Sequence, residues 1–174
     1  TLGRRVGVLD RGRLRQLGTP EQLRDQPGTR FVAACLGRMS VVDGRAGGGD
    51  RSGAAFVSDC GSVSVPLPAV VARRLGPAPG PTNLALGIRP EDVFPAPPGE
   101  PPPPGWGVLT GWPVVSAEPV GSGWLLTLAR GTASVRAWVP SGPPPRVGPP
   151  ADWHLDAARL TWFDHAGDRI EPTA

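Results

Sequence analysis

The sequence has no lysine, no tyrosine, two cysteines and two histidines among its 174 residues. Because a nucleotide-binding loop of the G-x-x-x-x-G-K-[ST] type needs a lysine, these residues cannot form one. No segment reaches the ~20 apolar residues of a membrane-spanning helix, and no signal-peptide pattern opens the chain. A phosphate-binding loop and a spanning helix are therefore excluded from the sequence as printed.

The few cysteines and histidines are not spaced for metal binding. Cys35 and Cys60 stand in dissimilar contexts, so we expect two buried free thiols, as in a protein of the reducing cytosol. His154 alternates with apolar neighbours in a strand-like segment, and His165 falls in a predicted turn. A zinc site needs closer spacing and further ligands, so we expect no metal site.

The positive charge of the chain does not gather in one place. All 18 basic residues are arginines, and the net charge is only +3. Apart from short clusters such as Arg4/Arg5 and Arg73/Arg74, the arginines are scattered. A nucleic-acid-binding surface concentrates its charge on one face, so this distribution disfavours nucleic acid as a partner.

Glycine and proline, by contrast, are abundant. The chain holds 25 glycines and 24 prolines, a content that predicts short strands, many turns and no long helix. The tract PAPPGEPPPPG, 95–105, cannot supply many ladder hydrogen bonds and predicts an extended, mobile loop. The stretch RAGGGDRSG, 45–53, lies between strand-like segments and predicts a turn.

Residues 1–37 have a character of their own. The segment RVGVLD, the turn at Asp10-Arg11-Gly12 and RLRQLG predict a β-hairpin over 5–17. Thr19 and Gln22 have the spacing of a capping box, which predicts a short helix ending before Pro27. A second helix is expected from Thr29 to Gly37, with Phe31, Val32, Cys35 and Leu36 on its inner side.

After Gly37, short alternating segments follow one another, with one short helix predicted at PAVVARRLG, 68–76. Strands with turns every 8–12 residues predict an all-β barrel or sandwich. The six tryptophans stand mostly among valine and leucine, which favours a core or an interface over base stacking.

No catalytic constellation is recognisable. The sequence offers no Ser-His-Asp or Cys-His arrangement, and the adjacent acids Glu91 and Asp92 point in different directions on a turn, unlike a glycosidase pair. We therefore expect this chain, taken alone, not to be an enzyme and to hold no cofactor.

The stretch LALGIRPEDVF, 84–94, changes abruptly from an apolar strand to a charged cluster. Gly87 permits a close backbone approach or a bulge, and Pro90 fixes the exit of the chain from the strand. Arg89, Glu91 and Asp92 can pair locally or cap backbone groups. We interpret the cluster as a structural corner and an inter-domain contact.

Three motifs resemble one family. Residues 1–37, with VLDRGR, GTPEQL and RFVAACLG, resemble the end of the ATP-binding domain of ABC importers, of the maltose/glycerol-phosphate type. LGIRPEDV, 86–93, resembles the signature of that family's C-terminal regulatory domain, and ARLTWFDHAGDRI, 158–170, resembles its closing strand and turn.

The resemblance implies a mainly β, OB-fold-like barrel of short antiparallel strands over 38–174, preceded by a hairpin-helix remnant of the ATP-binding domain over 1–37. It implies a regulatory region that pairs with an identical subunit, works with membrane-spanning subunits and lies at the inner face of the plasma membrane. ATP and Mg would bind motifs before Thr1, and sugars or related solutes would be imported. The structural or inter-domain candidates are Gly87, Arg89, Pro90, Glu91, Asp92 and Asp164.

Two alternatives stay open. A related β domain can bind a small oxyanion such as molybdate, although the strands lack a conspicuous Ser/Thr-rich anion nest. An OB-fold can also bind single-stranded nucleic acid, which the scattered charge disfavours.

Overall fold

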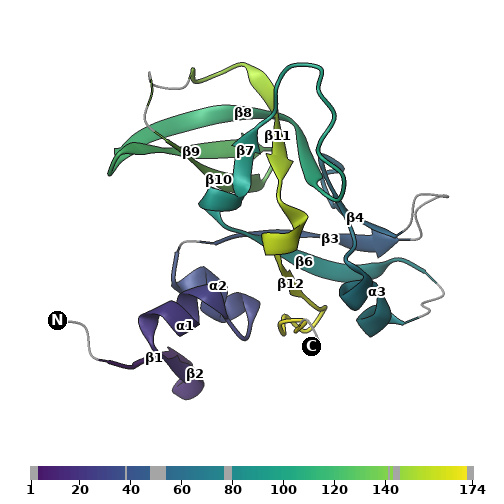
Figure 1. Cartoon of the computed structure of the whole chain (residues 1–174). Helices are drawn as coiled ribbons and strands as arrows, with labels where there is room; N and C mark the ends of the chain where they lie inside the picture. Colours follow the sequence, from purple (N-terminus) through teal and green to yellow (C-terminus); the bar gives the residue numbers. More distant parts are fainter. Residues whose placement is uncertain are drawn as a thin grey trace.

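The chain folds mainly into antiparallel strands that coil into an OB-fold-like half-barrel, as the sequence predicts (Figure 1). The computed structural model describes residues 4–37, 39–47, 54–76, 80–140, 142 and 146–171. Most of the turn predicted over 45–53 lies outside the described residues. None of the helices in these ranges has the length and apolar character needed to cross a membrane.

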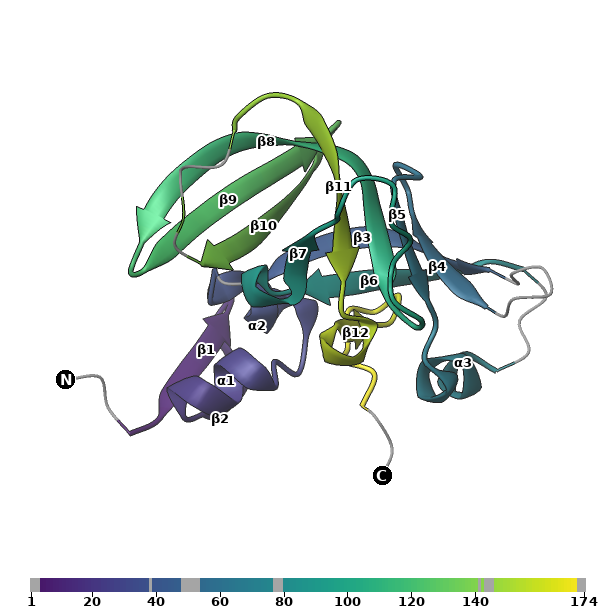
Figure 2. The same cartoon turned by 45° about the horizontal axis from the view of Figure 1, so that its top comes forward.

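A hairpin and two short helices precede the barrel and lie to one side of it (Figures 1 and 2). The Thr19 hydroxyl accepts a hydrogen bond from the Gln22 amide, and the Gln22 side chain accepts one from the Thr19 amide, which completes the predicted capping box. We call residues 4–37 the N-terminal appendage. Its elements are β1 (Val6–Asp10), β2 (Arg13–Gly18), α1 (Pro20–Asp25) and α2 (Arg30–Cys35).

Of the four residues expected on the inner face of α2, Val32 and the half-buried Leu36 lie there, whereas Phe31 and Cys35 do not. Val32 and Ala33 are buried, whereas Phe31 is 37% exposed and Cys35 is exposed. Apolar residues lie on more than one side of this six-residue helix, so contacts outside the helix decide which side faces inward. Val32 packs with Val8 and Leu23 of the appendage.

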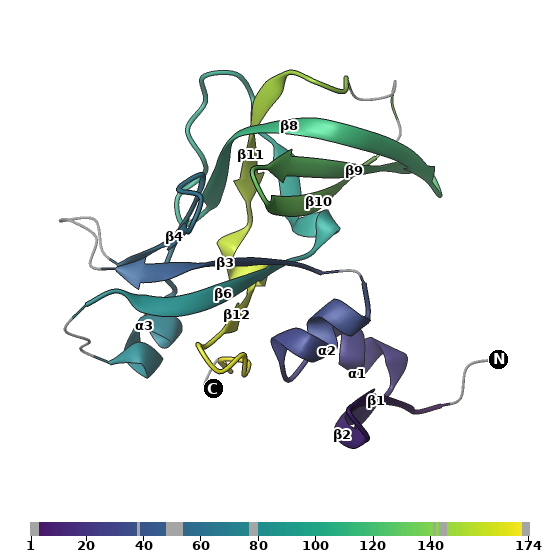
Figure 3. The ribbon, with the colours of Figure 1, turned by 180° about the vertical axis from the view of Figure 1, so that it is seen from behind.

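The barrel strands follow the order β10-β9-β8-β5-β4-β3-β6-β12, while β11 pairs with β7 and β8. Every pair is antiparallel, and β3 lies between β4 and β6 (Figure 3). The strands are β3 (Ser40–Gly47), β4 (Ala55–Ser58), β5 (Val63–Pro66), β6 (Thr82–Ile88), β7 (Val93–Pro95), β8 (Gly107–Val120), β9 (Gly123–Arg130), β10 (Ala133–Pro140), β11 (Pro150–Leu155) and β12 (Thr161–Phe163). The helical turns are α3 (Ala69–Leu75), η1 (Pro90–Asp92) and η2 (Ala157–Arg159).

The long strand β8 curls the sheet back on itself. Its first part pairs with β5 and β11, and its second part pairs with β9. As a result β10 returns toward β3, where the Arg136 amide donates a hydrogen bond of 3.0 Å to the Ser40 hydroxyl. The coiled sheet encloses one apolar core.

Tryptophans form part of that core. Trp112 is fully buried, and its indole N–H donates to the Ser62 hydroxyl at 3.0 Å. Trp153 is also buried and donates to the Trp112 carbonyl at 3.1 Å. Because both indole donors are satisfied, these rings contribute their apolar area to the core without an unpaired polar group.

Two expectations about cysteine are corrected here. Cys35 and Cys60 are both free, as predicted, but both are exposed and not buried. Cys35 lies on the outer side of α2, and Cys60 lies in the turn after β4, where its sulfur contacts the Ser58 and Ser62 hydroxyls at 3.2 and 3.0 Å. A turn between two paired strands places its side chains outside the sheet, whatever their apolar character.

The proline tract has no helix and, beyond Pro95 at the end of β7, no strand, as predicted. It is tied to the barrel at both ends: the Ala96 amide donates to the Asp152 carbonyl at 3.1 Å, and Phe94 contacts Trp106 with ring centroids 5.3 Å apart.

Candidate functional site

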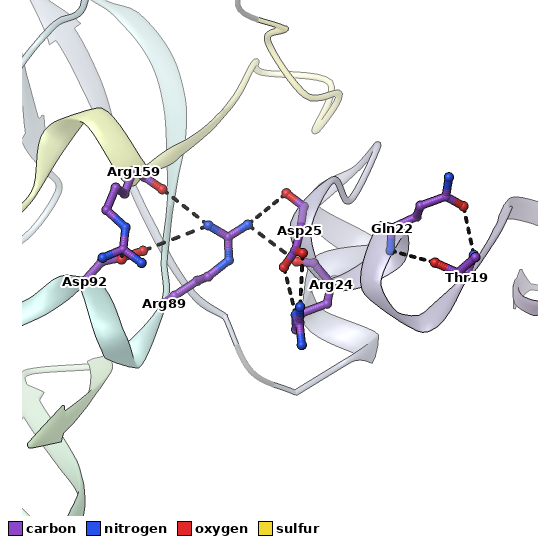
Figure 4. Close-up of polar contacts among 7 residues, drawn as sticks. All are labelled: Thr19, Gln22, Arg24, Asp25, Arg89, Asp92 and Arg159. Carbon is purple, nitrogen blue, oxygen red and sulfur yellow. Dashed lines mark hydrogen bonds and ion pairs between the residues drawn. The ribbon is translucent and has the colours of Figure 1, made fainter. Parts of the chain in front are cut away.

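The charged cluster after β6 lies where the N-terminal appendage meets the barrel (Figure 4). Strand β6 ends at Ile88, and Pro90 starts the short turn η1, which brings the side chains of Arg89 and Asp92 within 3.9 Å of each other. Arg89 is only 17% exposed and Asp92 is fully buried, whereas Glu91 is exposed.

Arg89 joins three segments of the chain. One guanidinium nitrogen donates to the Asp25 carbonyl at 2.9 Å, at the end of α1, and the other donates a long hydrogen bond of 3.4 Å to the Arg159 carbonyl in η2. The planar fork of arginine presents several donors in fixed directions, which suits a bridge of this kind. The side chain therefore fastens the appendage to two parts of the barrel.

Asp92 is a buried carboxylate between two arginines. Arg159 Nε lies 2.9 Å from Asp92 Oδ1, and Arg89 Nη1 lies 3.9 Å from Oδ2. Neither oxygen accepts a hydrogen bond of good geometry from any residue that the structure describes. Burial raises the pKa of Asp92 to about 6, and it outweighs the opposite effects of Arg159 and Arg89.

Asp164 is not brought into this cluster. It follows β12, and its carboxylate accepts hydrogen bonds from the amides of Ala166 and Asp168 at 2.9 and 3.0 Å. The turn that it shapes nevertheless reaches the appendage, because the Gly167 carbonyl accepts from the Arg30 amide at 2.8 Å. Asp164 thus orders a second contact between the two parts.

A third contact runs along the start of β3. Arg30 forms a two-pronged ion pair with Asp43, with distances of 2.9 and 3.1 Å. Both side chains are about half exposed, so the pair contributes no more than about 1 kcal/mol. Nearby, Ala33 packs with Met39, Ala85 and Phe163.

Gly87 lies beneath this apolar contact. In β6 it pairs with Val41 and Thr161 without a change of register, so the strand has no bulge there. A Cβ atom at this position would lie 2.4 Å from Met39 Sδ and 3.0 Å from Phe163 Cε2. The glycine serves a close approach of side chains.

We predict that Gly87→Ala lowers the free energy of unfolding by about 1–3 kcal/mol, the usual cost of overpacking a core. Chemical denaturation measures this change. Gly47→Ala, at the end of β3, is the matched control because its added Cβ meets no atom of the described residues within 4 Å. Equal stabilities of the two variants would contradict the close-packing role of Gly87.

The structure also shows partners of the cluster that the sequence did not reveal. Arg159 and Asp25 lie 70 and 64 residues away from Arg89 in sequence. Asp25 contributes its backbone carbonyl. Every residue has this group, so the residue type at position 25 could not predict the contact. Among the described residues, no three His, Cys, Asp or Glu side chains gather as metal ligands.

No family model matches the chain. Among curated proteins, the xylose/arabinose import ATP-binding protein XacK of Haloferax volcanii is 41% identical over 95 residues, which are 53% of this chain and 22% of XacK. The sn-glycerol-3-phosphate import ATP-binding protein UgpC of Chromobacterium violaceum is 40% identical over 95 residues, or 53% of this chain and 23% of UgpC.

Over about half of its length, the chain is similar to ABC importer ATP-binding subunits. A shorter match, 44% identity over 46 residues, links 26% of it to 12% of the spermidine/putrescine import ATP-binding protein PotA of Thermobifida fusca. The matches cover about half of this chain and less than a quarter of XacK or UgpC. This coverage agrees with a C-terminal portion of such a subunit.

The fold occurs among solved structures. The cytoplasmic molybdate-binding protein ModG, in a form with molybdate bound, aligns with a TM-score of 0.52 and 16% identity, covering 70% of this chain and 93% of ModG. At this identity the likeness concerns the fold alone.

Proposed function

We propose that the chain is the C-terminal regulatory and dimerisation region of the ATP-binding subunit of an ABC importer. The observation that carries the proposal is the identity of about 40% to XacK and UgpC over 95 residues. A sugar or a related solute is the proposed cargo because these two relatives are named for pentoses and for glycerol phosphate. PotA, by contrast, is named for two polyamines, spermidine and putrescine.

The contacts around Arg89 suit such a region. In the parent subunit, the appendage would be the end of the ATP-binding domain, and the barrel would follow its movement through Arg89, the Asp164 turn and Arg30. ATP and Mg would bind residues outside this chain, which would not hydrolyse ATP alone. Membrane-spanning subunits and a second copy would be the partners, at the inner face of the plasma membrane.

Light scattering tests the dimerisation role. We expect the purified chain to have twice its monomer mass of 18.1 kDa at micromolar concentrations. Calorimetry with Mg-ATP should show no binding to the same sample. A monomer at every accessible concentration would contradict the dimerisation role. Hydrolysis of ATP by the chain would contradict the proposal that ATP binds only to residues outside it.

The oxyanion alternative is supported only by the fold shared with ModG. Calorimetry with molybdate and with sulfate separates it from the importer role, which predicts no tight, stoichiometric complex with either ion. A stoichiometric molybdate complex would put the alternative first.

A further inference from the structure

A cavity of about 240 Å³ lies beside the Arg89 cluster, between the end of α1, the start of α3 and the closing strand. One part of its wall is apolar, from Val70 and Val71 of α3 to Leu160 and Ile170. The other part is cationic. The charged side chains that line it are Asp25, Arg89, Arg159 and Arg169.

Two buried donors in this wall have no acceptor among the described residues. Arg89 Nε and Trp162 Nε1 are both buried, and neither has a hydrogen-bond partner within the described parts of the chain. Trp162 is 4% exposed, and its ring contacts Phe56 with centroids 5.7 Å apart in an edge-to-face arrangement. Indole and guanidinium nitrogens only donate, so both groups need an acceptor from outside.

The charge of the wall favours an anion. Arg169 is 15% exposed, and its nearest carboxylate, Glu171, is 3.7 Å away and largely in solvent. Asp25 is the only carboxylate in the described lining, and hydrogen bonds from Arg24 both occupy it and lower its pKa. Three guanidinium groups therefore line the cavity: Arg89 and Arg159 share the buried carboxylate of Asp92 behind the wall, and Arg169 has the solvent-exposed Glu171 beside it.

We propose that this cavity binds a small organic anion, a phosphate monoester or a carboxylate with a short apolar body. The charged head accepts hydrogen bonds from Arg89, Arg169 and the Trp162 indole, and the body packs on Val71 and Leu160. The cavity is smaller than the ~300–1,000 Å³ of sites for drug-sized ligands, so the ligand must be smaller than a drug-sized molecule. The proposal does not depend on the importer role.

Calorimetry of the full chain tests the proposal with phenyl phosphate and benzoate as probes. Inorganic phosphate and phenol serve as controls, because they represent the charged head and the apolar body of phenyl phosphate separately. We expect one site, with phenyl phosphate or benzoate bound more tightly than inorganic phosphate and with no binding of phenol. The affinity should fall as salt is added. Absence of heat with both organic anions at millimolar concentration would overturn the proposal.

Two variants locate the site. Arg169→Gln removes one charged donor but keeps the backbone bond from Arg169 to the Gly28 carbonyl, and it should weaken binding at least about tenfold. Arg74→Gln, on the exposed last turn of α3, is the matched control and should bind as the parent chain does. Equal affinities of the two variants would place the anion elsewhere and overturn the proposal.

The indole proton of Trp162 gives a direct readout. Trp162→Phe identifies its resonance in a ¹H–¹⁵N spectrum by loss of one indole peak. On addition of phenyl phosphate that peak should move, since the N–H gains an acceptor. A bound state in which other peaks move and this one does not would contradict the assigned site.

Discussion

Replacing Arg89 by alanine lowers the free energy of unfolding by about 2–4 kcal/mol at about pH 8. The change removes the 2.9 Å hydrogen bond to the Asp25 carbonyl and the longer one to Arg159. It also removes one of the two cations beside Asp92, which is fully buried. A buried carboxylate that loses a cation must either stay charged at higher cost or take up a proton.

Urea denaturation of Arg89→Ala measures this loss. Arg74→Ala is the control, since Arg74 is exposed in α3 and should change stability by less than about 0.5 kcal/mol. Arg89→Lys should fall between the two, because a lysine keeps the charge but not the planar fork. If Arg89→Ala were as stable as the control, the corner would not hold the fold together.

The second large effect belongs to Asp92. We expect the chain to lose stability as the pH rises between the ordinary carboxyl pKa of 3.8 and the folded value of about 6. In that window the folded state binds more protons than the unfolded state, so the free energy of unfolding falls with rising pH. Above about pH 6 the charged form costs up to about 3 kcal/mol.

Asp92→Asn removes this cost. The variant should be more stable than the parent chain above about pH 6 and should lose the slope between about pH 4 and about pH 6. In the Asn background, Arg89→Ala should cost less than in the parent, because no buried charge is left unpaired. The groups that face the carboxylate are Arg159, Arg89, Glu91 and Asp156.

Denaturation curves at several pH values give the comparison. Glu91→Gln is the neighbouring control: Glu91 is exposed, and its charge only adds to the raised pKa of Asp92. A lower stability of Asp92→Asn at every pH would mean that the ion pair with Arg159 outweighs the cost of burial. The charged Asp92 would then stabilise the fold instead of destabilising it, contrary to our prediction.

Local chemistry made the elements predictable. The capping box at Thr19, the turn at Asp10-Arg11-Gly12 and the alternation along β3, β4 and β5 each depend on neighbours in sequence, and the structure has all of them. The alternation predicted for β6 is wrong, because its residues from Leu84 to Ile88 are all buried. Arg11 adopts the positive φ of 48° that the tight turn requires. The mainly β class follows from these short-range signals.

The errors concern choices that tertiary contacts make. The inward face of α2 depends on what the helix packs against, so Phe31 and Cys35 came out exposed. The partners of Arg89 lie far away in sequence, and one is a backbone carbonyl. The cavity beside it brings Asp25 and Arg89 next to the closing segment that carries Trp162 and Arg169, and no local pattern joins these three parts of the chain.

Hydrogen exchange of the parent chain and of Arg89→Ala tests most directly whether the corner fastens the appendage to the barrel. The account predicts that appendage amides such as Leu23 and Ala33 lose more protection in the variant than Leu86 in β6, which loses only what the lower global stability removes. An equal loss throughout the chain, or none in the appendage, would contradict it.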